Sequence, residues 1–176
     1  LVMAVVVGLS ILSGALAEED KRGTVVVIGD SIAAGSGVDL SEAFPARLQE
    51  RVDEAELPFQ VINAGLSGDT TAGGVRRLNW LLRREIDVLI IELGGNDALR
   101  GVPVEETKAN IARMIDSARE KYPDIEVIVT GMQIYDDWGP EYTAGFKALF
   151  HDVAKEKETE LVPFLLEGMG GLPEFN

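Results

Sequence analysis

The sequence has 176 residues, 46% of them hydrophobic, which suits one globular domain with a single core. Its formal net charge of −14 predicts repulsion from phosphates and from anionic lipid, and this argues against a nucleic-acid-binding protein. It has no cysteine and one histidine, so disulfides, thiolate chemistry and Cys-ligated metals are excluded and a His-built metal site is disfavoured. We therefore expect no metal and no cofactor.

The N-terminal segment has the features of a secretion signal. Residues 1–17, LVMAVVVGLSILSGALA, are uncharged and apolar and end in a small-x-small pattern, so we predict a signal peptide over 1–17, with its n-region missing, and a short linker over 18–23. This predicts a periplasmic or secreted protein without stable membrane insertion. The alternatives are a retained anchor, although a full span needs about 20 apolar residues, and a core helix, which the polar linker disfavours.

From Thr24 to Asn176 we predict one domain in which short apolar runs alternate with helical segments. The runs at 24–28, 60–63, 87–92, 125–130 and 161–165 suit strands buried on both faces, as in a parallel sheet. Ser41 and Asp69 are expected to cap the first two helices. The helical stripes are Phe44, Leu48, Val52 and Ala55; Val75, Leu78 and Leu82; Ile111, Ile115, Ala118 and Tyr122; and Phe146, Leu149, Phe150 and Val153. The predicted fold is a three-layer α/β/α domain with a five-stranded, mostly parallel sheet.

Small polar turns follow the first three predicted strands, at 29–31, 63–70 and 94–97. The carboxyl ends of parallel strands meet at one edge of the sheet, where ligands bind. A serine at a strand-to-helix turn, here Ser31, is placed to act as a nucleophile. The backbone N–H groups of Ser31 and Gly68 and the side-chain amide of Asn96 can donate to the oxyanion of an acyl-transfer reaction.

The segments Gly29-Asp30-Ser31, SGDT at 67–70 and GGND at 94–97 resemble, in order and position, the first three sequence blocks of the SGNH (GDSL) hydrolase family. The resemblance is closest to bacterial periplasmic thioesterases, lysophospholipases and arylesterases, and it runs from about Thr24 to Phe175. It implies a flavodoxin-like fold, Ser31 as nucleophile, and Gly68 and Asn96 as oxyanion donors. It also implies an ester, thioester or lysophospholipid substrate, and we expect a monomer.

The family's fourth block, an Asp-x-x-His that supplies the general base, does not occur in this sequence. His151 lies in a predicted helix and points away from the stripe of Phe146, Leu149, Phe150 and Val153, so we expect it on the surface. We expect a chain truncated at its C-terminus, with the last helix missing, nearly inactive and with exposed apolar surface near the fifth strand. The alternative is a remnant of the same fold that binds acyl ligands without turnover. A nucleotide-binding domain is disfavoured, because neither a P-loop nor the dinucleotide glycine spacing occurs.

Two loops bear on the substrate. We assign substrate contacts to Asp30 and, after the fourth predicted strand, to Met132, Ile134 and Tyr135. The apolar surface of the last three could line an acyl groove or pack under a loop. Residues 98–103 could gate that groove around Gly101 or form a rigid connector.

Overall fold

The computed structural model describes residues 22–134 and 138–168. The predicted signal peptide and Tyr135 lie outside the described residues. In the described part of the chain, one five-stranded sheet has the order β2-β1-β3-β4-β5, and each neighbouring pair of strands is parallel. The strands are β1 Gly23–Gly29, β2 Phe59–Gly65, β3 Val88–Glu92, β4 Glu126–Thr130 and β5 Glu160–Val162. The predicted parallel α/β fold is confirmed.

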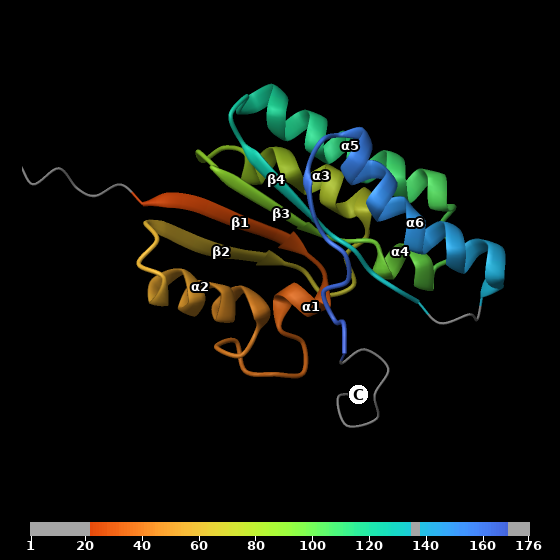
Figure 1. The fold of residues 1–176 in the computed structure, drawn as a ribbon, viewed down its shortest axis with the longest axis horizontal. Coiled ribbons are helices and arrows are strands. Elements are labelled where there is room, and N and C mark those ends of the chain that lie inside the picture. The colour runs from red at the N-terminus through yellow and green to blue at the C-terminus, as the bar shows by residue number, and fades with distance from the viewer. Residues whose placement is uncertain (1–21, 135–137, 169–176) are drawn as a thin grey trace, which may run out of the picture.

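The sheet lies between two layers of helices (Figure 1). Helices α3, α5 and α6 cover one face, and α1 and α2 lie on the other. The helices of the described residues are α1 Ser31–Ala34, α2 Phe44–Glu54, α3 Thr71–Leu81, α4 Gly95–Leu99, α5 Val104–Lys121 and α6 Pro140–Glu156. None of these helices is long and apolar enough to cross a membrane.

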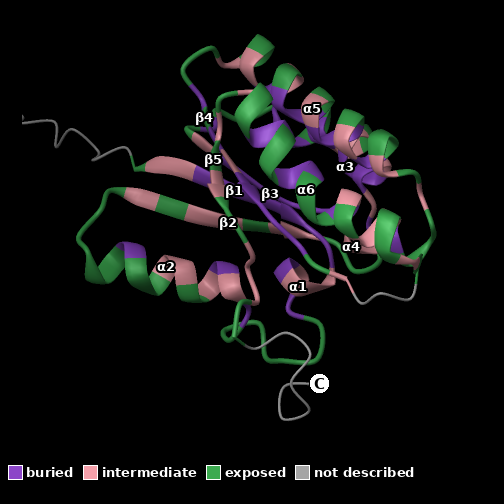
Figure 2. Ribbon diagram, turned by 45° about the vertical axis from the view of Figure 1, so that its right-hand side comes forward, coloured by how far each residue is buried: buried purple, intermediate pink, exposed green. Residues whose placement is uncertain are grey.

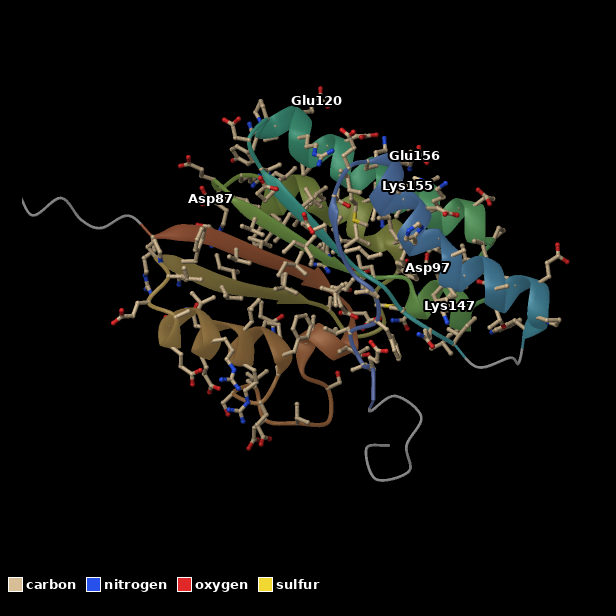
Figure 3. All side chains as sticks on the ribbon, viewed as in Figure 1. Asp87, Asp97, Glu120, Lys147, Lys155 and Glu156 are labelled. Carbon is tan, nitrogen blue, oxygen red and sulfur yellow. The ribbon has the colours of Figure 1, made fainter. Side chains whose placement is uncertain are left out.

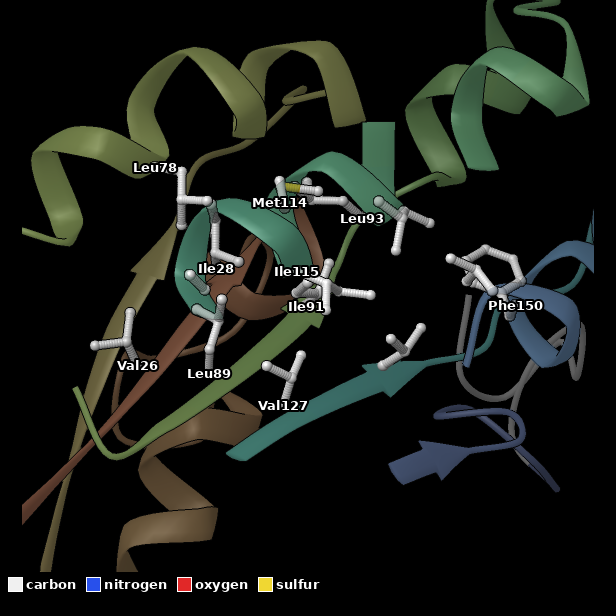
Figure 4. Packing of buried hydrophobic residues seen from close by; sticks show 14 of the residues in the cluster. Val26, Ile28, Leu78, Leu89, Ile91, Leu93, Met114, Ile115, Val127 and Phe150 are labelled. Atoms are coloured by element: carbon white, nitrogen blue, oxygen red, sulfur yellow. The ribbon is translucent and has the colours of Figure 1, made fainter. Parts of the chain in front are cut away.

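The main core lies between the sheet and α3, α5 and α6, and the central strands are buried there (Figure 2). Alternate residues of these strands project into the core (Figure 4). These strand residues are Val26, Ile28, Leu89, Ile91, Val127 and Val129. Most members of the predicted helical stripes are buried or half-buried against them, as expected for faces repeating every three or four residues. Ala55 is exposed because α2 ends at Glu54.

The opposite face of the sheet carries a smaller core under α1 and α2, built on Val25, Val27 and Ile90. Along β3, β4 and β5 this face is less covered by the part of the chain that the structure describes. Val88 and Ile128 are half-buried there, and Val162 is 37% exposed.

Three local predictions were wrong. Residue Ala43, not Ser41, precedes α2 as its N-cap, and it makes no side-chain cap. Thr70, not Asp69, caps α3, because its hydroxyl accepts the N–H of Gly73 while the Asp69 carboxylate binds Arg77. The fifth strand ends at Val162, not at 165, because Pro163 has no N–H to continue the ladder.

Candidate active site

The candidate nucleophile, Ser31, is the first residue of α1 and follows β1 after a single residue. That residue, Asp30, is the N-cap, and its carboxylate accepts the backbone N–H of Ile32 at 3.0 Å. The helix ends after one turn at Gly35, whose φ of +78° is a left-handed conformation that glycine adopts readily. Helix α1 lies at the carboxyl end of β1 (Figure 1), and its first residue, Ser31, is half-buried at this edge of the sheet.

The backbone N–H groups of this turn are almost all occupied. Asp30 and Ala33 donate to the Glu92 carboxyl group, and Ile32 donates to Asp30. The next three N–H groups, of residues 34–36, donate to backbone carbonyls within the turn. Among the described residues none accepts from the N–H of Ser31, so this donor is free for a ligand at the edge of the sheet.

Two carboxyl groups lie beside the nucleophile. Glu92, the last residue of β3, is fully buried, and burial, followed by the charge of Asp30, raises the pKa of Glu92 to about 8. Burial also raises the pKa of Asp30, while hydrogen bonds from Ile32, Asn96 and Ser31 act in the opposite direction. At neutral pH the Glu92 carboxyl group is therefore mostly protonated.

Asn96 reaches the same place from the third turn. It is the second residue of α4, and its side-chain Nδ2 donates to Asp30 Oδ2 at 3.1 Å. The amide nitrogen of asparagine carries two N–H groups, so one remains after this bond. Helix α4 is held by Asp97, labelled in Figure 3, which is buried and accepts the backbone N–H of Thr71 at 2.8 Å. The structure thus brings Ser31 and Asn96 together through Asp30.

Gly68 lies in the second turn, with a φ of +79° that favours glycine. A Cβ placed on Gly68 would have only the Arg100 guanidinium within 4 Å, at 3.8 Å, so the face of this residue is open. Two contacts tie the turn to the others: the hydroxyls of Ser36 and Ser67 are hydrogen-bonded, and Arg100 Nη2 donates to the Gly68 carbonyl at 2.9 Å. Segment 98–103 is therefore anchored to the glycine turn through Arg100.

A half-buried arginine, Arg77, links the turns to the ends of the strands. Arg77 of α3 donates to Asp69 Oδ2 at 2.7 Å, to the Ala64 carbonyl at 2.6 Å and to the Gly29 carbonyl at 3.1 Å. One guanidinium thus joins the ends of β1 and β2 to the SGDT turn. Its planar fork of donors suits this task, which a single ammonium could not perform.

Two of the predicted substrate contacts, Met132 and Ile134, lie in the described part of the loop after β4. Met132 is buried, and its sulfur lies 3.4 Å from the position of a Cβ on Gly95, beside Asp30. Ile134 is half-buried against the main core. Tyr135 lies outside the described residues. Trp138 is half-exposed and packs against Gly101.

His151 is on the surface, as predicted. Its side chain is 70% exposed in the middle of α6, and its Nδ1 lies 3.7 Å from the carboxylate of the neighbouring Asp152. The described residues contain no cluster of three or more His, Cys, Asp or Glu side chains that could hold a metal.

Sequence reasoning missed two residues that organise the site, Glu92 and Arg77. Glu92 had a usable signal, because it is the only charge in the apolar run VLIIEL at 88–93, and a charge in a buried strand needs partners. Arg77 had none, since Arg76 precedes it and an exposed helical arginine would look the same.

The sequence profile of the GDSL-like Lipase/Acylhydrolase family matches residues 27–174. The chain is 41% identical over 168 residues to Esterase TesA of Pseudomonas aeruginosa, covering 92% of this chain and 83% of that protein. It is 32% identical over 145 residues to the Thioesterase 1/protease 1/lysophospholipase L1 of Escherichia coli K12, covering 82% of this chain and 67% of that protein.

Solved structures agree. The fold matches AlinE4, an SGNH-hydrolase family esterase, with a TM-score of 0.83 at 32% identity, over 88% of this chain and 82% of that one. It matches the crystal structure of TesA with a TM-score of 0.80 at 42% identity, over 85% of this chain and 83% of that one.

Proposed function

The chain belongs to the GDSL-like lipase/acylhydrolase family, a family of carboxylic ester hydrolases, and from that premise we propose that it cleaves esters through an acyl-enzyme on Ser31. One observation carries this assignment. Ser31 combines a hydroxyl at the edge of the sheet with a backbone N–H that no described residue accepts, and Asp30, the residue before Ser31, accepts a hydrogen bond from the Asn96 amide.

In the proposed reaction, Ser31 Oγ attacks the carbonyl carbon of the substrate and its proton passes to a general base. The resulting oxyanion accepts hydrogen bonds from the N–H groups of Ser31 and Gly68 and from the second N–H of Asn96. The leaving alcohol or thiol takes the proton as the tetrahedral intermediate collapses, and water then releases the acyl group by the reverse steps. Removal of one such donor costs a factor of about 10²–10³ in kcat, which is the loss expected for Asn96→Ala.

The proposed reaction needs a general base beside Ser31, and no histidine of the described residues lies there. His151 is the only histidine of the sequence, and its place in the middle of α6 does not bring it to Ser31. Asp30 touches the site, but its carboxylate already accepts from Ile32 and Asn96. We therefore propose that the chain as given hydrolyses esters slowly, at the roughly 10³–10⁴-fold over water that an oxyanion hole and binding provide.

The names of the relatives set the range of substrates. Those proteins are named as esterase, arylesterase, thioesterase and lysophospholipase. We propose an ester, thioester or lysophospholipid substrate for this chain, with apolar acyl contacts from Met132 and Ile134. The assignments of Tyr135 and Asp30 to substrate binding remain predictions.

Residues 1–17 are proposed as a signal peptide, with the mature protein a monomer in the periplasm or outside the cell. The apolar run and its small-x-small end support this proposal. N-terminal sequencing of the protein recovered from cells tests it: an N-terminus at or near Glu18 is expected, whereas retention of the apolar run would overturn it.

Hydrolysis of p-nitrophenyl butyrate and labelling by a fluorophosphonate together test the proposed reaction. We expect slow turnover and fluorophosphonate labelling confined to Ser31, and Ser31→Ala should abolish the labelling. Labelling that persists in Ser31→Ala would refute the nucleophile. If the protein neither turns over substrate nor takes the label but binds a fluorescent fatty acid, the acyl-binding alternative is the better account.

A further inference from the structure

A carboxyl group lies buried at the end of β3. Glu92 has no exposed surface, and the four strand residues before it are all apolar. In the β1–β3 ladder Glu92 is paired with Gly29, the residue that ends β1 and leads into the nucleophile turn. A buried carboxyl group is costly, so its partners indicate what it does.

Both partners of this group are backbone amides of the nucleophile turn. Glu92 Oε2 accepts the N–H of Asp30 at 3.1 Å and that of Ala33 at 3.3 Å, the residues just before and two after Ser31. Gly29 makes this reach possible, because a Cβ on Gly29 would lie 2.4 Å from Oε2. One oxygen thus holds the turn on both sides of Ser31.

We propose that Glu92 is a positioning residue of the active site: its Oε2 fixes the turn so that the N–H of Ser31 stays unpaired and aimed at the substrate. The effect extends to Asn96, because the residue that Glu92 holds, Asp30, in turn holds the Asn96 amide at 3.1 Å. Glu92 thereby orients two proposed oxyanion donors without touching the substrate. This inference rests on the proposed role of Ser31.

The group acts as a neutral acid. Its Oε2 accepts two backbone N–H groups, so the proton belongs on Oε1, which has no hydrogen-bond partner among the described residues. The charged groups around it are the Asp30 carboxylate of the β1–α1 turn and the Arg77 guanidinium of α3, which donates to the Gly29 carbonyl. The carbonyl oxygen of a glutamine can replace Oε2 as acceptor, whereas leucine, of similar size, cannot.

Glu92→Gln and Glu92→Leu therefore form a matched pair, compared in the full chain on p-nitrophenyl butyrate. Glu92→Leu should lower kcat on the order of 100-fold with KM little changed, the loss that a misplaced reacting group causes. Glu92→Gln should stay within about 3-fold of the original protein at pH 7, because its carbonyl oxygen can accept the same N–H groups. Full activity of Glu92→Leu, or an equal loss in Glu92→Gln, would overturn the proposal.

A second measurement does not depend on activity or on the folding of the leucine variant. In ¹⁵N spectra, the amide signals of Asp30 and Ala33 should shift together as Glu92 titrates near pH 8, and the shift should be absent in Glu92→Gln. Amide signals that ignore this titration would refute the hydrogen bonds themselves. If Ser31→Ala keeps full activity while the amides titrate, the proposed function fails and the contact stands.

Discussion

Replacing Arg77 by methionine should destabilise the protein and loosen the first two turns of the site, at 29–31 and 63–70, at once. The guanidinium is the partner of Asp69, whose side chain is 8% exposed, while Arg77 itself is 23% exposed. Removal of one member of a buried ion pair leaves an uncompensated charge and costs about 3–5 kcal/mol. The Gly29 carbonyl keeps the Leu66 N–H as a second partner. Most of the cost therefore comes from leaving the buried Asp69 carboxylate without its cationic partner.

Urea unfolding followed by tryptophan fluorescence measures this loss. Asp69→Asn in the same chain is the matched control, because it removes the charge that Arg77→Met leaves unpaired. The double variant should regain about 1–2 kcal/mol over Arg77→Met, since contacting residues are coupled by this order of energy. If Arg77→Met costs less than about 1 kcal/mol, or the double variant shows no recovery, the guanidinium does not hold the turns as described.

Three further predictions follow from the site. In Gly65→Ala the new Cβ would lie 2.3 Å from the Ala34 backbone nitrogen, so α1 must move; thermal unfolding should show a loss of about 1–3 kcal/mol, and kcat should fall. Because His151 is on the surface, His151→Ala should change the free energy of unfolding, measured with urea, by no more than about 0.5 kcal/mol and leave ester hydrolysis intact. A loss of the hydrolysis rate in this variant would instead identify His151 as the general base. The pKa of Glu92 is raised from 4.5 to about 8, so the contribution of the protonated Glu92 carboxyl group to stability is complete below pH 4.5 and is lost as the pH rises to about 8. Unfolding midpoints measured over this range should decline, and Glu92→Gln should flatten the decline.

The positions of the strands and turns along the chain could be predicted because they depend on local pattern. Continuous apolar runs identify strands buried on both faces, and a parallel sheet gathers the residues after those strands at one edge. That argument predicts Ser31 and Asn96 at the same edge of the sheet, and in the structure Asn96 donates to Asp30, the residue that precedes Ser31. It also connected the Gly68 turn, which the structure joins to its neighbours through Ser67 and Arg100.

Tertiary structure alone decided what holds these turns. Glu92 and Asp30 are 62 positions apart, and Arg77 reaches Gly29 across 48, so no local periodicity encodes either contact. The capping predictions for Ser41 and Asp69 were wrong for a related reason: a short polar side chain can cap a helix or bind a distant partner, and Asp69 binds Arg77. Sequence thus determined which residues arrive at the edge of the sheet, because burial of apolar runs is a local signal. The packed structure determined which of their donors stay free, because that depends on every neighbour that competes for them.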